Sequence, residues 1–330
     1  MSFESHSELP KGTPLTRVKE IIDLLGYTKI ANSLKIPDMK GNYFWTDEVD
    51  YKSWSGIGLQ LYQDNKRIVT IDTRTSVARS EWDLIHQNKT IKLIRDTFGG
   101  EFWTDAGKSR YWRPDGNPPS PVSSGCYLAR WHFHNVMIKP RLYLMQRGLD
   151  QPNTELAPRG LEILDEMNPR LFSNNLLLPY FVAVWEEYLR SSFIALLRYS
   201  KDRQAALKRA SLNQRQLEAI ATGANTVEEA LADTLSFQRP SVVSKNFRLI
   251  SNQWNIGAVW RKPYRRRKIS LYDSIESYVE YRNEFVHSGQ MNIRVTDKMV
   301  DRILKDFEAA ADRAYAAFGK FANFDPIKDY

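Results

Sequence analysis

An arginine, an asparagine and a histidine occur within six consecutive positions near the end of a predicted helix: Arg282, Asn283 and His287. A guanidinium is a rigid fork that binds two phosphate oxygens at once, and an imidazole exchanges protons near neutral pH. The amide next to the arginine can orient either group through hydrogen bonds. These residue types therefore suit chemistry on a phosphate ester, in which one group stabilises charge while another transfers protons.

The helix that carries these residues is bounded by clear signals. Ser270 and Asp273 resemble a capping box at its start, and Gly289 is a natural stop. At about 100° per residue, its apolar positions form one stripe: Ile275, Tyr278, Val279, Phe285 and Val286. Arg282 falls within this stripe, where a charged group is rarely tolerated unless it is paired or faces a functional cleft or a subunit interface.

The spacing of Arg282 and His287 resembles the Arg-X4-6-His signature of the HEPN superfamily, in which a polar residue such as Asn283 often follows the arginine. The segment 179–190 is similar to the long first helix of these domains, which combines an aromatic-rich stripe with an acidic residue. The resemblance covers residues 179–330 and is nearest to the subgroup called RiboL-PSP-HEPN. It predicts an all-helical bundle with the motif on the penultimate helix.

The resemblance implies a metal-independent endoribonuclease that needs no cofactor and works as a homodimer. RNA supplies its own nucleophile, the 2′-hydroxyl, so the expected products are a 2′,3′-cyclic phosphate and a 5′-hydroxyl. In that chemistry Arg282 would hold the scissile phosphate, His287 would transfer protons, and Asn283 would orient the phosphate or the histidine. By analogy with the family, the biological role would be that of a toxin or effector in bacterial stress or antiviral defence.

Two further features belong to the same hypothesis. Glu186 is turned toward the apolar face of its helix more than Glu187, so it either pairs with Arg282 or is a solvated acid at the flank. A run of cations with an interleaved tyrosine and proline precedes the motif helix: Arg261, Lys262, Tyr264, Arg265, Arg266, Arg267 and Lys268. This run either contacts the RNA backbone or is a solvated basic loop.

The first half of the chain offers weaker candidates. His132 and His134 are two apart on a predicted strand, a spacing that can hold a metal. No third ligand is identifiable, so we expect no metal and favour histidines hydrogen-bonded in a half-buried sheet. A basic cluster either receives an anion or a nucleic-acid base or is scattered surface charge, which we favour: Arg74, Arg79, Lys108, Arg110, Trp112 and Arg113.

The expected architecture is α+β overall. A mixed α/β domain over 1–150, with a sensor, regulatory or partner-binding role, precedes a linker over 151–178 and an all-helical HEPN-like domain over 179–330. Within the first domain the pattern predicts helices over 15–25 and 80–98, a hairpin of 57–62 with 67–72, and a strand over 127–137. The helices expected afterwards span 179–199, 201–222, 226–237, 241–252, 270–287 and 296–321.

The composition of the chain indicates its cellular compartment and the charge of its partners. The single cysteine, Cys126, excludes an internal disulfide and fits a reducing compartment, so the cytoplasm is expected. The first 15 residues lack the apolar core of a secretory signal, and no apolar stretch approaches the length of a membrane span. Forty-seven Lys and Arg against 39 Asp and Glu give a net charge of +8, which favours polyanionic partners such as RNA.

Three classes of function remain open on the sequence. The leading hypothesis is an RNase effector, with RNA, a second copy of the chain and a regulatory protein as partners. The alternative is a non-catalytic HEPN-like module that binds RNA, a nucleotide or a protein. A basic DNA-binding regulator is the third, and the lack of an obvious helix-turn-helix stands against it.

Overall fold

The computed structural model describes residues 2–31, 36–113, 116–150, 168–208 and 211–327. The chain divides into two compact units, 1–124 and 125–330, which we call the N-terminal unit and the helical unit. The N-terminal unit is built on an antiparallel sheet and the helical unit consists mainly of helices, which confirms the predicted order of a mixed part followed by a helical one.

The sheet of the N-terminal unit has seven strands in the order β2-β3-β4-β5-β1-β6-β7, and every neighbouring pair is antiparallel. The strands are β1 (Phe3–Glu8), β2 (Thr28–Lys29), β3 (Met39–Trp45), β4 (Ile57–Gln63), β5 (Val69–Thr75), β6 (Glu101–Thr104) and β7 (Gly107–Lys108). The predicted hairpin is confirmed as β4 and β5. Burial alternates along both strands, so one face of the sheet is buried and the other is partly exposed.

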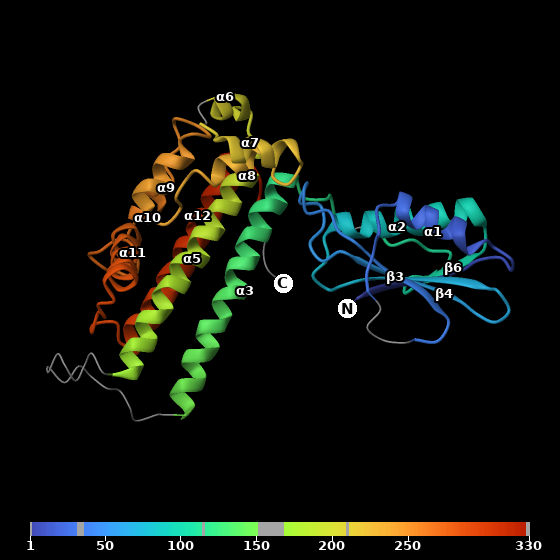
Figure 1. The fold of residues 1–330 in the computed structure, drawn as a ribbon, viewed down its shortest axis with the longest axis horizontal. Helices are drawn as coiled ribbons and strands as arrows, with labels where there is room; N and C mark the ends of the chain where they lie inside the picture. The colour runs from blue at the N-terminus through green and yellow to red at the C-terminus, as the bar shows by residue number, and fades with distance from the viewer. Residues whose placement is uncertain (1, 32–35, 114–115, 151–167, 209–210, 328–330) are drawn as a thin grey trace. The chain divides into compact units, whose positions relative to one another are not determined.

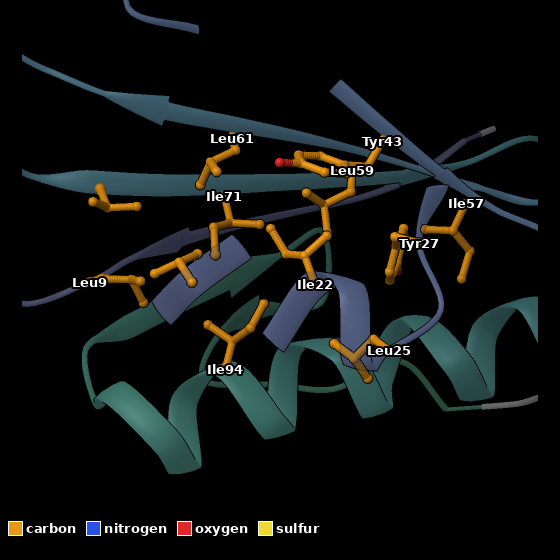
Figure 2. Close-up of a cluster of buried hydrophobic side chains, with 12 residues drawn as sticks. Leu9, Ile22, Leu25, Tyr27, Tyr43, Ile57, Leu59, Leu61, Ile71 and Ile94 are labelled. Atoms are coloured by element: carbon orange, nitrogen blue, oxygen red, sulfur yellow. The ribbon is translucent and has the colours of Figure 1, made fainter. Parts of the chain in front are cut away.

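Two helices cover one face of this sheet, α1 (Leu15–Leu24) and α2 (Glu81–Phe98) (Figure 1). Both helices were predicted, and the capping box of Ser80 with Asp83 is present. The core lies between the helices and the sheet, where Figure 2 shows Ile22, Leu59 and Ile94 pointing toward one another. The opposite face of the sheet carries no helix among the described residues of this unit (Figure 1).

The strand predicted over 127–137 is wrong, because these residues lie inside a long helix, α3 (Pro121–Asp150). From Cys126 onward its buried positions recur at intervals of three and four, as a helix requires: Cys126, Ala129, Phe133, Met137 and Pro140. The run of alternating aromatic and polar residues hid this period. A short alternating pattern is thus compatible with either structure when the buried face of the helix is narrow.

The predicted domain boundary is corrected in the same way. The units divide at 124/125 rather than within 151–178, since α3 packs on helices of the helical unit. Of the predicted linker, residues 151–167 lie outside the described residues, and the remainder forms the start of α5 (Pro169–Arg198). The helix predicted to begin at Pro179 therefore begins earlier and continues through that proline.

The true start of α5 had a sequence signal. The Asn168 side chain accepts hydrogen bonds from the backbone nitrogens of Arg170 and Leu171, and Pro169 occupies the first helical position. The remaining helices are α6 (Arg203–Lys208), α7 (Gln214–Ala221), α8 (Val227–Ala232), α9 (Pro240–Phe247), α10 (Gly257–Arg261), α11 (Leu271–Ser288) and α12 (Asp297–Ala322). In the part of the chain that the structure describes, no helix has both the length and the apolar composition of a membrane span.

The long helices α5 and α12 run side by side through the helical unit (Figure 1). An aromatic cluster joins them to α10, with Trp185 5.3 Å from Trp260 and 5.6 Å from Phe307 between ring centroids. Both indoles are fully buried, and each donates its N–H to a backbone carbonyl oxygen. This core fixes the position of α11, which packs against α5, α10 and α12.

Candidate functional site

The helix α11 begins and ends where the sequence predicts. The Ser270 hydroxyl accepts a hydrogen bond from the Asp273 nitrogen at 3.2 Å, and Gly289 ends the helix with a φ of 71°. The buried residues of α11 all lie in its first half: Leu271, Ser274, Ile275, Tyr278 and Val279. From Arg282 onward the side chains are half-buried or exposed, so the candidate motif lies where the helix emerges from the core.

The guanidinium of Arg282 is half-buried and has no acidic partner among the residues that the structure describes. Its Nη1 donates to Asn283 Oδ1 at 2.9 Å, while its Nε is buried and donates no hydrogen bond. A charged group in this state is costly unless something else compensates it. The arrangement therefore leaves a half-buried cation without a counter-charge and a buried N–H without an acceptor.

His287 lies in the last turn of α11 and is exposed. It comes five positions after Arg282, which corresponds to a rotation of about 140° around the helix, so the two side chains leave the helix in different directions. Asn283 is four residues before His287 and shares its side of the helix. The hydrogen bond joins the Arg282 guanidinium to Asn283, so the amide lies between the direction of the arginine and that of the histidine.

An apolar patch lies beside these residues. It consists of Phe172 and Leu176 on α5 with Phe285 and Val286 on α11, and the Phe172 and Phe285 ring centroids are 6.1 Å apart. Phe172, Leu176 and Val286 are 48%, 50% and 47% exposed. Adjoining exposed apolar side chains of this kind are typical of surfaces that another molecule covers.

The predicted pairing of Glu186 with Arg282 is wrong. Glu186 accepts hydrogen bonds from the Phe237 backbone nitrogen at 3.3 Å and from Gln238 Nε2 at 2.9 Å. Its carboxylate therefore fastens the segment between α8 and α9 to α5 and takes no part in the candidate site.

Arg267, in the basic run, is a structural residue. Its guanidinium makes two hydrogen bonds to the fully buried carboxylate of Asp306 on α12, one of them at 2.8 Å. Tyr278 on α11 donates to the same carboxylate at 2.8 Å. Burial and the neighbouring Asp306 raise the pKa of the Tyr278 hydroxyl above its ordinary range. The prediction that Arg267 contacts RNA is therefore corrected, since it anchors the basic run to α11 and α12.

The other residues of the basic run precede α11, and the first of them, Arg261, ends α10. The Arg261 guanidinium stacks 3.5 Å from the Tyr272 ring centroid, and Tyr264 has the guanidinium of Arg265 at 5.0 Å. The remaining cations are exposed: Lys262, Arg266 and Lys268. At 1.5 Å per residue, about 16 Å of helix separates this loop from Arg282, so within one copy the loop and the motif occupy opposite ends of α11.

His132 and His134 do not share a face, because two residues on a helix are about 200° apart. His134 Nε2 lies 3.2 Å from Asp312 on α12, Arg130 donates to the same carboxylate at 3.0 Å, and His132 is exposed. Burial alone would raise the pKa of Asp312, but the hydrogen bonds from His134 and Arg130 hold it below its usual range. No cluster of potential metal ligands occurs among the described residues.

The basic cluster of the N-terminal unit is not one site. Arg74 pairs with Glu4, and Lys108 with Glu101, on the exposed face of the sheet. Trp112 is buried and stacks on Phe3 at 4.3 Å between ring centroids. Scattered charge, the alternative that we favoured, describes these residues, with Arg79 lying over the other aromatic ring of that stack, Phe3, and Arg110 and Arg113 exposed.

Comparison with protein-family models, curated proteins and solved structures finds no significant match to the chain. Function must therefore be argued from the geometry of the molecule itself. That geometry singles out the end of α11, where an uncompensated arginine, an amide and an exposed histidine adjoin an apolar patch.

Proposed function

We propose that the chain is a metal-independent endoribonuclease whose site is formed by Arg282, Asn283 and His287. The observation that carries the proposal is the half-buried Arg282 guanidinium, which has no acidic partner in the described part of the chain and one buried N–H without an acceptor. A bound phosphate group would supply the missing counter-charge. The similarity of this helix to the motif helix of HEPN domains supports the same assignment.

The residue types at this end of α11 are sufficient for transesterification of RNA. The 2′-hydroxyl attacks the adjacent phosphorus, the bond to the 5′-oxygen breaks, and a 2′,3′-cyclic phosphate and a 5′-hydroxyl result. His287 moves a proton at the attacking or the leaving oxygen, and Arg282 stabilises the charge that develops on the phosphate oxygens. Asn283 holds the guanidinium through its side-chain oxygen.

The proposed active form is a homodimer joined next to the motif. Within one copy Arg282 and His287 leave α11 in different directions, so a second copy across a two-fold axis would complete the arrangement of acid, base and cation. The apolar patch of Phe172, Leu176, Phe285 and Val286 supports this proposal. In one copy, Phe172, Leu176 and Val286 are each about half exposed. Burial of such side chains is the main favourable contribution to protein association.

The test is cleavage of total RNA by the purified chain in the presence of EDTA, followed by mapping of the ends. We expect cleavage with 2′,3′-cyclic phosphate ends, unaffected by the chelator. His287→Ala should lower the rate by about 10²- to 10⁴-fold, the usual contribution of general acid–base catalysis. The matched control is His132→Ala, which removes an exposed histidine of the same unit outside the site.

Two results would contradict the proposal. If the His287→Ala and His132→Ala variants cleave equally well, the chemistry does not depend on the motif. If the chain binds RNA, a nucleotide or a protein at this site but never cleaves, the non-catalytic HEPN-like module is the correct alternative. Arg282→Ala would then show which kind of ligand is bound. It would weaken binding of a phosphate-bearing ligand and leave binding of an uncharged ligand unchanged.

A further inference from the structure

The face of the sheet away from α1 and α2 is a hollowed, mostly polar surface, which we call the open face. Strand register places one side chain from each of six strands in a single row across it: Asn42, Gln60, Asp72, His6, Trp103 and Lys108. The neighbouring row contains Phe44, Gly58, Arg74 and Glu4. A cavity of about 970 Å³ lies over the two rows, and a second of about 420 Å³ adjoins it at Asp72.

Aromatic side chains bound this surface on both sides. Phe44 on β3 is 37% exposed, and Trp103 on β6 lies at the other side, four strand spacings away. At about 4.8 Å per spacing, the floor between them is about 19 Å wide, long enough for roughly six residues of an extended peptide. Gly58 lies in this floor beside Arg74, and it leaves room where any other residue would place a side chain.

The open face is strongly acidic. The residues that line its two cavities include one arginine, one histidine and six carboxylates: Glu4, Glu8, Asp38, Asp64, Asp72 and Asp105. Glu4 pairs with Arg74 and Asp72 with His6, at 3.3 and 2.6 Å. The other four carboxylates make no ion pair within the described residues. Several negative charges on one concave surface therefore lack a counter-charge.

This acidity is local. Residues 1–124 carry 17 Lys and Arg against 16 Asp and Glu, whereas residues 125–330 carry 30 against 23. The positive excess of the chain thus belongs to the helical unit, and the open face is an acidic surface on an almost neutral unit. A polyanion would be repelled from it, because phosphate binding requires basic side chains.

Two cations of the unit itself already lie on this face, each beside a carboxylate. The Lys108 ammonium lies 5.5 Å from the centroid of the Trp103 ring and pairs with Glu101 at 2.7 Å. Arg74 pairs with Glu4 in the neighbouring row. A cation held between an aromatic ring and a carboxylate is the contact by which proteins recognise arginine and lysine side chains.

We propose that the open face of the N-terminal unit binds an extended basic peptide segment of a partner protein. Its arginine or lysine side chains would meet the carboxylates without an ion pair, those of Glu8, Asp38, Asp64 and Asp105, and its chain would lie along the rows between Phe44 and Trp103. This inference does not depend on the proposed ribonuclease activity, because no residue of α11 takes part in it.

The test uses the full-length chain and a fluorescent probe, an acetylated and amidated six-residue peptide in which arginine alternates with glycine. Fluorescence anisotropy should show saturable binding that weakens as salt screens the charges. Glu8→Gln combined with Asp105→Asn should weaken it about tenfold, since each change removes one exposed charge contact. The matched control is Glu20→Gln with Asp96→Asn, which removes two charges from exposed positions of α1 and α2.

A second pair of variants tests the floor. A Cβ at Gly58 would meet only the Arg74 carbonyl oxygen, at 3.8 Å, so Gly58→Ala should fold and bind normally. Gly58→Arg fills the floor with a cation and should abolish binding of the probe. The circular dichroism melting temperature of each variant shows whether it is folded, and the Glu8 and Asp105 pair decides the matter if Gly58→Arg is not.

Two outcomes would overturn the proposal. The first is equal affinity of the probe for the Glu8→Gln/Asp105→Asn variant and for its control. The second is a labelled uridine oligonucleotide that binds the chain, binds more tightly after Glu8→Gln/Asp105→Asn and is lost after Trp103→Ala. That pattern would assign the open face to RNA.

Discussion

Two arginines near the two ends of α11 differ in one respect, their counter-charge. Arg267, just before the helix, meets the buried carboxylate of Asp306, and Tyr278 donates to the same group. Arg282, six residues before the end of the helix, meets only the neutral amide of Asn283. Both guanidinium groups are partly buried. One cation is thus fully compensated within the chain, and the other is not.

The difference shows how a structural arginine is separated from a functional candidate. A buried ion pair with good geometry holds elements together, and breaking it leaves a costly unpaired charge. A half-buried arginine without an acid raises the free energy of the folded chain unless an external anion compensates it. The uncompensated one therefore points to a ligand, although the run around Arg267 carries far more positive charge.

The largest effect is expected when each of these two arginines in turn is replaced by alanine. Arg282→Ala should lower RNA cleavage by more than about 10²-fold, because it removes stabilisation of the charge on the reacting phosphate, and it should not lower the free energy of unfolding. Arg267→Ala should lower the free energy of unfolding and leave the rate of RNA cleavage unchanged. Cleavage rates measured with urea unfolding of the same samples check both. If Arg267→Ala abolishes cleavage at full stability, the comparison between the two ends is wrong.

Arg282→Lys sharpens the same comparison. An ammonium keeps the charge but loses the planar fork, so cleavage should stay well below that of the natural chain. A full rate for Arg282→Lys would show that the site needs only a positive charge there and that Asn283 does not orient the cation.

The next largest effect is expected from a substitution of Asp306, and it concerns stability. Asp306→Asn leaves Arg267 without a counter-charge in a buried site and should lower the free energy of unfolding by about 3–5 kcal/mol. Asp301→Asn is the control on the same helix, since its exposed pair with Lys305 is worth at most about 1 kcal/mol. The two free energies come from urea denaturation. Equal values would mean that Arg267 is not an anchor.

Local signals were sufficient to predict many of the elements from the sequence. Ser80 and Ser270 cap the two helices as predicted, Gly289 ends α11, and the alternating pattern gives the hairpin of β4 and β5. Each of these features is decided by residues close together in the chain, so its physical cause is visible in a short window of sequence.

Contacts between distant residues were not predictable in this way. Asp306 is 39 residues from Arg267, and Gln238 is 52 residues from Glu186, so nothing near either charge announces its partner. The strand predicted around Phe133 failed for a related reason, because the three- and four-residue period of α3 appears only when its buried partners are known. The open face, too, depends on a strand order that the sequence does not state.

The third effect concerns the surface beside Arg282. Val286→Glu would place a charge in the proposed dimer interface and should raise the dimer dissociation constant by at least about 30-fold, the cost of burying an unpaired carboxylate. Leu217→Glu, at a similarly exposed leucine on α7, is the control and should leave the dimer intact. Sedimentation equilibrium measures both. A natural chain that is monomeric at micromolar concentration would remove the second copy from the proposal.

The smallest effect belongs to the exposed cations beside Arg267. Lys262, Arg266 and Lys268 have no structural role comparable to that of Arg267, so each alanine variant should remain as stable as the natural chain. If they contact the RNA backbone, each loss should weaken RNA binding a few-fold and reduce the slope of log affinity against log salt by about 0.7. The rate at saturating RNA should not change, because about 16 Å of helix separates these side chains from Arg282.

Anisotropy with a labelled oligonucleotide at several salt concentrations gives the slope. An unchanged slope in all three variants would show that the loop is solvated and that Arg282 alone meets the phosphate.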